Sequence, residues 1–389
     1  MASKVTVQKN TFAESLAIVG RAIASHTHLP VLGNILISKE ESQLRLSATD
    51  LTIGVSVWMD AKMDGDVGLT LPAKTLTDVV NSFTEPEVTF SVNGKPEAAL
   101  KCGTYKGVVK GMEAEEFPKM PEFDTSGGIP IDAATLKEMI RAVAFAASVD
   151  ESRPVLTGVL LQMEGKTISL AATDGFRLAL HKTEVALSLE KKQLIIPASV
   201  LKEVLRILSA TKASTVTLYL PSAGSQVVLR LDDSRRVQIV SQLIDGKFPD
   251  YQVIIPKGYK TRTIVDAGEL LKACKQAGII AREGSNVVRF HLQPGTDQSG
   301  KVKLLAASAE TGESEIELDA TVEGQELEIA FNVKFLQDAL EAISTKRVVI
   351  ETNAHNTPAM IRPAGCVASP TGEEQDAYRY VLMPMHIDS

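Results

Sequence analysis

Cysteine, aromatic residues and long apolar runs are all scarce in this chain of 389 residues. Its three cysteines, Cys102, Cys274 and Cys366, are odd in number and form no CxxC pair, so the sequence predicts neither a disulfide framework nor a cysteine metal site. The six histidines show no HExxH or similar spacing. We therefore expect no bound metal, no cofactor and a reducing, cytoplasmic location.

Membrane and secretion signals are missing as well. No stretch of about 18 apolar residues is present, so the chain is not expected to span a membrane. The N-terminal segment MASKVTVQKN lacks the apolar core of a secretion signal. The net charge of −7 argues against nonspecific adhesion to nucleic acid but leaves room for a local basic face. With Trp58 as the single tryptophan, the cores must consist mainly of Val, Leu, Ile and Ala.

Common catalytic motifs are absent too, including GxSxG and GxGxxG. Gly165-Lys166-Thr167 resembles the end of a phosphate-binding loop, but Leu160 stands where that motif requires Gly. The triplet also falls in a predicted hairpin turn instead of preceding a helix. We interpret it as a turn, and nothing in the sequence indicates an enzyme.

One pattern occurs three times. It reads LSATDLTIGVSV at Leu46–Val57, LAATDGFRLALH at Leu170–His181 and, more weakly, LAASAETGESEIEL at Leu305–Leu318. The first two copies begin 124 positions apart and the last two 135. A period of this length indicates repeated domains, because solenoid units span only roughly 20–50 residues.

Each repeat is predicted to contain two helices and several strands. Apolar residues at helical spacing indicate one helix, and a phrase of the type LPAKTLTDVV indicates a second. The predicted helices are Phe12–Ala24, Leu71–Val80, Leu136–Ala147, Ile196–Leu205, Leu270–Ile280 and Phe331–Leu340. Alternating apolar and polar residues indicate the strands. The predicted strands are Val31–Ser38, Gln43–Thr49, Glu87–Val92, Ala98–Cys102, Leu156–Met163, Thr167–Ala172, Thr215–Leu220, Gln226–Leu231, Val287–Leu292, Val302–Ala307, Arg347–Glu351 and Ala359–Pro363. A last strand is predicted within Tyr380–Ile387, with adaptable apolar side chains beyond it.

Two connectors separate the repeats. Asp124–Pro130 contains the Gly, Ser and Pro of a linker, and a second linker lies near Ile255–Lys260. We therefore predict an N-terminal domain over 1–126, a central domain over 127–255 and a C-terminal domain over 256–389. Two helices packed on a mostly antiparallel sheet in each domain make the fold class α+β.

Two groups of charged residues recur in the repeats. Asp50 and Asp174 each follow a strand, and a turn-forming Asp that binds local N–H groups suits this recurrence better than a catalytic carboxylate. Lys202 and Arg206 lie four apart and share one helix face, as do Lys137 and Arg141. Taken alone, such charges usually indicate a solvated helix face, but their repetition in related positions strengthens the case for a functional role.

The C-terminal phrase VLMPM, at Val381–Met385, is unusually apolar for the end of a chain. Met-rich surfaces often bind partners. Core packing behind a last strand explains the composition equally well, and both interpretations stay open on composition alone.

Several segments, in the same order along the whole chain, resemble the family of the bacterial DNA polymerase III β subunit, the sliding clamp. The segments that carry the resemblance are Leu29–Ile37, Leu71–Leu76, Glu115–Pro118, Asp150–Val159, Ala171–Leu180, Asp245–Tyr251, Phe331–Leu340 and Val381–Met385. The resemblance implies a head-to-tail homodimeric ring of six domains that encircles double-stranded DNA without sequence specificity and acts as a processivity factor. Tyr105–Val109, Lys272–Cys274 and the segment before the Thr311–Glu315 loop are the implied subunit contacts.

The resemblance also implies which residues face DNA. Together with the basic helix faces, the DNA-facing candidates are His26, Lys74, Arg141, Asp150, Pro154, Val155, Lys202 and Arg206. A neutral or partly charged His26 stands where many relatives carry Arg, and Asp150 would repel phosphate.

A second implied site is a partner-peptide pocket with an apolar floor, where Arg177 and backbone groups orient the peptide. Its candidates are Leu156, Thr173, Gly175, Phe176, Arg177, Leu178, Pro249, Val253, Ile254, Pro358, Val381, Leu382, Met383, Pro384 and Met385. Phe176 and His386 depart from the family pattern at the rim.

The implied partners are the replicative polymerase catalytic subunit, the clamp loader, other polymerases, and mismatch-repair and ligase proteins. The alternative from another class is a monomeric peptide-binding adaptor with a clamp-like fold that does not encircle DNA. A hydrolase that uses Asp50 or Asp174 has little support.

Overall fold

The computed structural model describes residues 3–24, 28–121, 127–220, 224–233, 235–282, 286–296, 299–365 and 377–386. His26 and Cys366 lie outside these residues. The chain divides into two compact units. The first comprises Met1–Lys137 and Ser199–Ile244, and the second Glu138–Ala198 and Asp245–Ser389. None of the described helices is long and apolar enough to cross a membrane.

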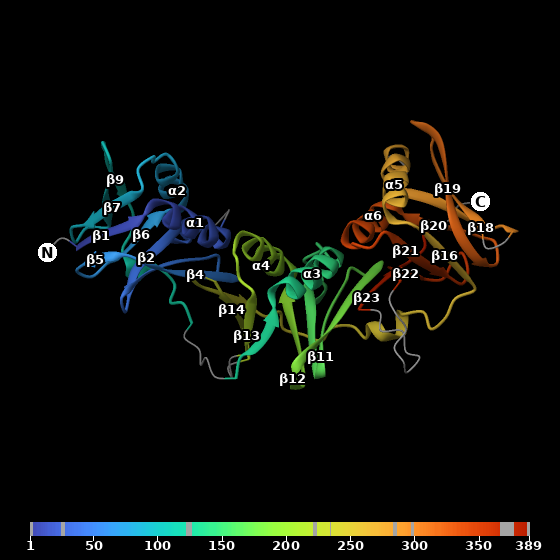
Figure 1. Ribbon diagram of the computed structural model, residues 1–389, viewed down its shortest axis with the longest axis horizontal. Coiled ribbons are helices and arrows are strands. Elements are labelled where there is room, and N and C mark those ends of the chain that lie inside the picture. Colours follow the sequence, from blue (N-terminus) through green and yellow to red (C-terminus); the bar gives the residue numbers. More distant parts are fainter. Residues whose placement is uncertain are drawn as a thin grey trace. The chain divides into compact units, whose positions relative to one another are not determined.

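The first unit contains a five-stranded antiparallel sheet in the order β5-β1-β7-β8-β9. Its strands are β1 (Ser3–Gln8), β5 (Lys62–Asp64), β7 (Glu87–Val92), β8 (Glu97–Cys102) and β9 (Tyr105–Lys110). The helices α1 (Lys9–Val19) and α2 (Ala73–Asn81) lie side by side (Figure 1). Phe12 of α1 stacks on Phe90 of β7 with ring centroids 6.1 Å apart, so the helix closes the core over this sheet.

An eight-stranded sheet in the same unit joins strands of the first and second repeats. Its order is β10-β13-β14-β15-β4-β3-β2-β6. The strands are β2 (Asn34–Glu40), β3 (Gln43–Thr49), β4 (Ile53–Asp60), β6 (Gly68–Pro72), β10 (Ile129–Asp132), β13 (Thr215–Tyr219), β14 (Gln226–Asp232) and β15 (Arg236–Gln242). Arg236 of β15 pairs with Trp58 of β4. Backbone bonds therefore make one continuous sheet across the predicted domain boundary.

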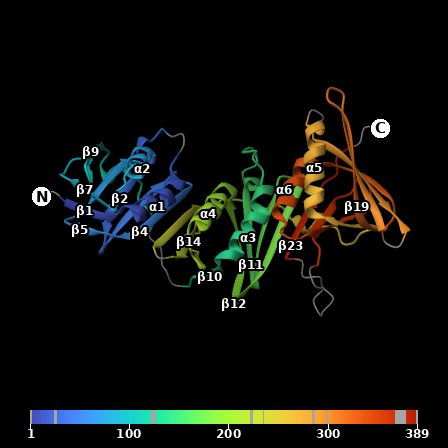
Figure 2. The same ribbon diagram turned by 45° about the horizontal axis from the view of Figure 1, so that its top comes forward.

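The second unit contains a ten-stranded sheet in the order β11-β12-β23-β22-β21-β16-β19-β18-β17-β20. Its strands are β11 (Gly158–Thr173), β12 (Arg177–Pro197), β16 (Thr261–Asp266), β17 (Val287–Pro294), β18 (Ser299–Ser308), β19 (Gly312–Gly324), β20 (Leu327–Asn332), β21 (Arg347–Thr352), β22 (Ala359–Pro363) and β23 (Tyr378–Leu382). Here β12 of the second repeat pairs with β23 of the third. The helices α5 (Ala267–Ala281) and α6 (Val333–Ala342) lie side by side in both views (Figure 2).

The remaining helices, α3 (Ala133–Val143) and α4 (Ala198–Ala210), belong to the second repeat. The second helix of each repeat buries the leucine at the same place in the repeated phrase, Leu76 in α2, Leu201 in α4 and Leu336 in α6, so these side chains face the core. Pro72 directly precedes α2. Proline lacks an N–H, but a residue at this position would have no hydrogen-bond partner for it within the helix. In α6 the corresponding Asn332 caps the helix instead, since its side chain accepts a bond from the Lys334 N–H at 3.0 Å.

Several predicted boundaries were wrong where proline intervenes. The strand predicted from Val31 begins only at Asn34, because Pro30–Gly33 forms a 3-10 turn, and Pro154–Thr157 does the same before β11. Proline fixes φ near the helical value and lacks a ladder donor. By contrast, the last strand predicted within Tyr380–Ile387 is confirmed as β23, which ends at Leu382, two residues before a proline.

The turn predicted at Gly165-Lys166-Thr167 also differs. These residues belong to β11, whose register against β12 shifts on both sides of Gly165. Thr167 continues the strand and no helix follows, so this segment does not have the architecture of a phosphate-binding loop.

Candidate functional site

A tight turn between β11 and β12 forms one wall of the site. The Thr173 hydroxyl donates to the Arg177 carbonyl at 2.6 Å and accepts the Gly175 N–H at 3.1 Å. The Asp174 carboxylate accepts the N–H groups of Phe176 and Arg177 at 2.9 and 3.1 Å. Gly175 has φ of 96°, in the region where glycine carries no steric penalty. Asp174 is thus the predicted turn-forming residue.

The first repeat builds the same turn without glycine. Thr49 donates to the Ile53 carbonyl at 2.9 Å, and Asp50 accepts two backbone N–H groups, each at 2.8 Å. Leu51 occupies the glycine position with φ of 77°. Both aspartates are therefore engaged with their own backbone, which confirms their predicted structural role and leaves a hydrolase without support.

Arg177 is held by three groups at once. Its Nε donates to Asp174 at 2.9 Å, one terminal nitrogen donates to Asp338 at 2.6 Å, and the other donates to the Phe145 carbonyl at 3.0 Å. The guanidinium also lies 4.3 Å from the centre of the Phe335 ring. Burial lowers the pKa of Arg177, but the hydrogen bond to Asp338 and the neighbouring acidic groups outweigh it and raise the pKa above its ordinary value.

Beside this anchored arginine lies a cavity of about 200 Å³, which we call the apolar hollow. Its floor is set by sheet register, because Leu178 of β12 pairs directly with Val381 of β23. The predicted pocket residues that line it are Leu156, Thr173, Gly175, Arg177, Leu178, Pro249, Ile254, Val381 and Met383. The 3-10 turn Tyr251–Ile254 closes one side. The structure therefore gathers residues from the second and third repeats around one cavity.

Other predicted pocket residues do not line this hollow. They are Phe176, Val253, Pro358, Leu382, Pro384 and Met385. Phe176 and Val253 are 59% and 77% exposed, whereas Leu382 is fully buried. Tyr380, two residues before Leu382, donates to the Phe335 carbonyl of α6 at 2.9 Å. Alternation along β23 therefore turns Leu382 towards the helices and Val381 towards the hollow.

Two residues that line the apolar hollow, Asp250 and Tyr251, were not predicted from the sequence. The Asp250 carboxylate accepts the Gln252 N–H at 3.2 Å and so caps the 3-10 turn. The Tyr251 hydroxyl bonds to the Gln162 side chain at 3.4 Å, and burial raises its pKa. Asp245–Tyr251 is one of the segments that carry the family resemblance, but only the folded chain places Tyr251 against β11.

The first repeat has filled the corresponding space. Gly54 stands where the second repeat has Leu178, and a Cβ added there would lie 2.6 Å from the terminal carbon of Met120. Met120 packs on a buried cluster that includes Leu32 and Phe117. The same turn thus borders a packed core in one repeat and a hollow in the other.

The basic candidates lie on helix surfaces. Lys74 on α2, Arg141 on α3 and Lys202 and Arg206 on α4 are all exposed. Arg206 forms an ion pair with Glu203 on its own helix. The basic stripes therefore point into solvent, as both a solvated face and a DNA-binding face require.

The loop before β11 holds the remaining DNA-facing candidates. Asp150 is exposed, and hydrogen bonds from Ser152 lower its pKa, with a further contribution from Arg153. It is therefore ionised near neutral pH, which disfavours direct phosphate contact. Pro154 and Val155 begin the 3-10 turn next to it.

Three α+β repeats of paired helices on antiparallel sheets define a clamp-type architecture. Comparison with known protein families and solved structures gives the same class. Models of the DNA polymerase III beta subunit match residues 3–121 with the N-terminal domain, 130–250 with the central domain and 252–386 with the C-terminal domain. The beta sliding clamp of Synechococcus elongatus is 30% identical over 391 residues, covering 99% of this chain and all of that one. The beta sliding clamp of Staphylococcus aureus is also 30% identical, with 92% and 95% of the two chains covered.

Solved structures give the same result. The DNA polymerase III beta subunit of Thermotoga maritima is 28% identical, with a TM-score of 0.88 over 99% of this chain and all of that one. The Pseudomonas aeruginosa sliding clamp bound to griselimycin is also 28% identical, with a TM-score of 0.88 and full coverage of both chains. The chain therefore belongs to the family of the DNA polymerase III beta subunit, the beta sliding clamps. The predicted family, α+β clamp fold and accessory, non-enzymatic role are confirmed, and the monomeric adaptor is not favoured.

Proposed function

We propose that two copies of this chain close head to tail into a ring of six domains around double-stranded DNA. Such a ring tethers the replicative polymerase by topology, because a closed ring cannot leave duplex DNA sideways. The predicted domains over 1–126, 127–255 and 256–389 supply three of the six positions. We also propose that the protein works in the cytoplasm, where it meets the chromosome.

The edge strand β9 supports the dimer. It pairs with β8 in the described sheet and ends the strand order there. Tyr105 and Val108 on it are exposed, and an exposed edge of this kind is a template for pairing with another chain. On the other side, Cys274 in α5 is buried, so Lys272 is the part of Lys272–Cys274 with a surface position. Contacts between different surfaces generate rings when the rotation closes.

The exposed cations Lys74, Arg141, Lys202 and Arg206 support loose contact with the DNA backbone. Contacts to phosphate carry no sequence information and weaken with salt. A few such contacts suit a sliding ring, since tight binding would stop it. Asp150 fits this role poorly because it is ionised, and Arg153 beside it is the better phosphate ligand.

Loading onto DNA tests the ring. The protein is loaded by its clamp loader onto nicked circular DNA, separated from free protein by gel filtration, and the DNA is then cut once. Release on linearisation, with retention on uncut circles, is expected of a topological link. Retention on cut DNA without end blocks, or failure of a dimer to form in native mass spectrometry, would contradict it.

We further propose that the apolar hollow binds a short, partly apolar peptide segment. The implied donors are the replicative polymerase, the clamp loader, other polymerases, and mismatch-repair and ligase proteins. The observation that carries this proposal is a hollow of about 200 Å³ floored by Leu178 and Val381, with Arg177 held rigidly at its rim. Small-ligand sites commonly combine such an apolar floor with a few fixed polar groups.

Truncation tests the peptide site. Removal of Met383–Ser389 takes away the Met383 wall and the bond from its N–H to the Phe176 carbonyl at 2.9 Å. We expect loss of binding of a dye-labelled Leu/Phe-containing peptide in fluorescence anisotropy, with the dimer intact. Removal of residues 387–389 alone is the matched control and keeps binding. Unchanged affinity in the longer truncation would refute the assignment.

A further inference from the structure

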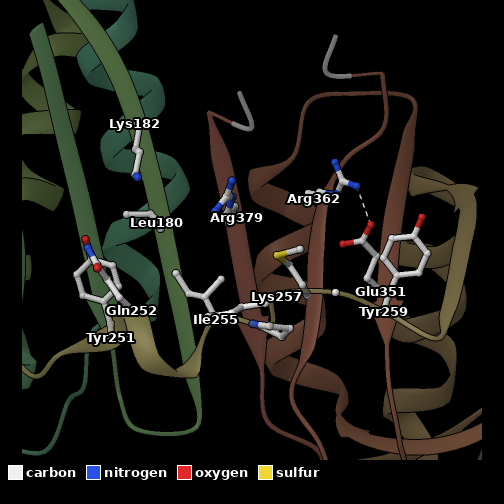
Figure 3. A pocket seen from close by; sticks show the side chains of 13 residues that line it. Leu180, Lys182, Tyr251, Gln252, Ile255, Lys257, Tyr259, Glu351, Arg362 and Arg379 are labelled. Atoms are coloured by element: carbon white, nitrogen blue, oxygen red, sulfur yellow. Dashed lines mark hydrogen bonds and ion pairs between the residues drawn. The ribbon is translucent and has the colours of Figure 1, made fainter. Parts of the chain in front are cut away.

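A second, larger hollow of about 690 Å³ lies on the same sheet, and we call it the cationic hollow (Figure 3). The strands β12, β23, β22 and β21 form its base, and the connector after Tyr251 crosses it. Leu180, Met360 and Ile255 supply apolar surface, and Lys182, Arg379 and Lys257 supply charge. It therefore combines apolar walls with a cluster of positive charges, although the net charge of the chain is −7.

The charges of this hollow are incompletely neutralised. Arg362 is closed off by an ion pair with Glu351 at 2.6 Å, which Figure 3 marks with a dashed line. Among the described residues, no carboxylate forms an ion pair with Lys182, Lys257 or Arg379. The Nε of Arg379 is buried and has no hydrogen-bond partner in the described part of the chain. Burial lowers the pKa of Lys182, and the nearby positive charge of Arg379 lowers it further. These cations are arranged to receive an anion.

The two hollows are neighbours on one surface. Leu178 pairs with Val381 at the floor of the apolar hollow, and Leu180 pairs with Arg379 in the cationic hollow. These pairs are two residues apart along β12, so they share a face and are separated by roughly 7 Å. Tyr251 lines both cavities. An extended peptide seated in the apolar hollow reaches the cations with its next two or three residues.

We propose that the cationic hollow binds the carboxylates of acidic residues that flank the apolar segment of a partner peptide. This inference rests on the proposed peptide-binding function of the apolar hollow and adds a charge preference to it. A protein segment suits the site better than a nucleic acid strand, because the hollow continues a peptide-sized apolar cavity and offers Leu180, Ile255 and Met360 to side chains. Carboxylates would supply the acceptors that Lys182 and Arg379 lack in the described chain.

Matched peptides test this preference. Two dye-labelled peptides share one Leu/Phe segment and differ only in flanking residues, glutamates in one and glutamines in the other, with the flank placed at either end in separate versions. Binding to the full-length protein is measured by fluorescence anisotropy at low and high salt. We expect roughly fivefold tighter binding of the glutamate peptide in at least one orientation, as for partly exposed charge pairs, and a smaller ratio at high salt.

Charge-removing variants locate the effect. The double variant Lys182→Gln with Arg379→Gln should bind both peptides equally, with the affinity for the glutamine peptide unchanged. Lys192→Gln removes an exposed charge elsewhere on β12 and should keep the full preference. Each variant exchanges a cation for a neutral amide, and its melting temperature verifies folding.

The outcomes separate the two proposals. Equal affinity of both peptides for the unaltered protein, or the same preference in the double variant, overturns the cationic hollow while leaving the apolar one. Binding of neither peptide overturns the peptide site and this inference with it. A single-stranded oligonucleotide that binds, loses affinity in the double variant and meets no glutamate preference assigns the hollow to nucleic acid and also overturns the proposal.

Discussion

Two arginine–aspartate pairs in this chain share spacing and atoms but differ in burial, which allows a controlled test of Arg177. Arg177 and Asp174 are three residues apart, with Nε 2.9 Å from the carboxylate and exposed side-chain fractions of 9% and 14%. Arg153 and Asp150 have the same spacing at 3.3 Å, with fractions of 48% and 47%. The first pair is part of a buried network, and the second lies in solvent.

Replacing Arg177 by Met keeps the apolar stem and removes the charge. Breaking a buried ion pair from one side costs about 3–5 kcal/mol, because the partner's charge is left without compensation. Asp338, the second partner, is 43% exposed and regains water when the arginine is removed. We therefore expect Arg177→Met to lower the free energy of unfolding by about 2–3 kcal/mol, and Arg153→Met to lower it by at most about 0.5 kcal/mol.

Urea unfolding followed by far-ultraviolet circular dichroism measures both variants at pH 7. A double-mutant cycle with Asp338→Asn isolates the contact between Arg177 and Asp338, for which we expect a coupling free energy of about 1 kcal/mol. Equal losses in Arg177→Met and Arg153→Met, or no coupling to Asp338, would show that burial of this network does not stabilise the fold as argued.

Three further predictions concern the turn, the pH dependence and the basic helix. Gly175→Ala should lower the free energy of unfolding by about 1–2 kcal/mol, because φ at this position is 96° and alanine is strained there. No neighbouring atom is close enough to clash with the added methyl group, so backbone strain is the whole effect. Urea unfolding measures the loss. Burial lowers the pKa of His181 from 6.5, so the unfolded chain takes up the proton first on acidification, and stability is lost as the pH falls below about 6.5. His181→Gln should flatten that slope in unfolding experiments at several pH values, and an unchanged slope would contradict it. Changing Lys202 and Arg206 to Glu should shorten retention on circular DNA, more at low salt, whereas Lys192→Glu should not; equal retention of both variants would mean that the α4 stripe does not face DNA.

The fold was largely predictable because its signals are local. Leu76, Leu201 and Leu336 recur at the same place in a repeated helical phrase, and all three are buried. Asp50 and Asp174 follow strands in equivalent positions and form equivalent turns. Such contacts span only a few residues, so the order of residue types already indicates them. The failures at Pro30 and Pro154 are local too, because proline began a 3-10 turn where an apolar run suggested a strand.

The site was predictable only in part. Family resemblance indicated the candidate residues of the site. It did not indicate which of them contact one another, because they lie far apart in the sequence. Leu382 and Val381 are adjacent in sequence and both buried, but strand alternation turns only Val381 towards the hollow. Tyr251 lies in a segment that carries the family resemblance, but nothing in the sequence indicated that it lines the hollow.

The sequence by itself determined three α+β repeats, most of their helices and strands, and the turn at each Thr-Asp pair, because hydrophobic periodicity and turn chemistry act over a few residues. Only the tertiary structure decided which repeat would hold a cavity. The pairing of Leu178 with Val381 joins strands about two hundred residues apart, and Arg177 finds Asp338 161 positions away. These contacts depend on register and packing between distant segments, so Met120 fills the space in one repeat while the other keeps it open beside an anchored arginine.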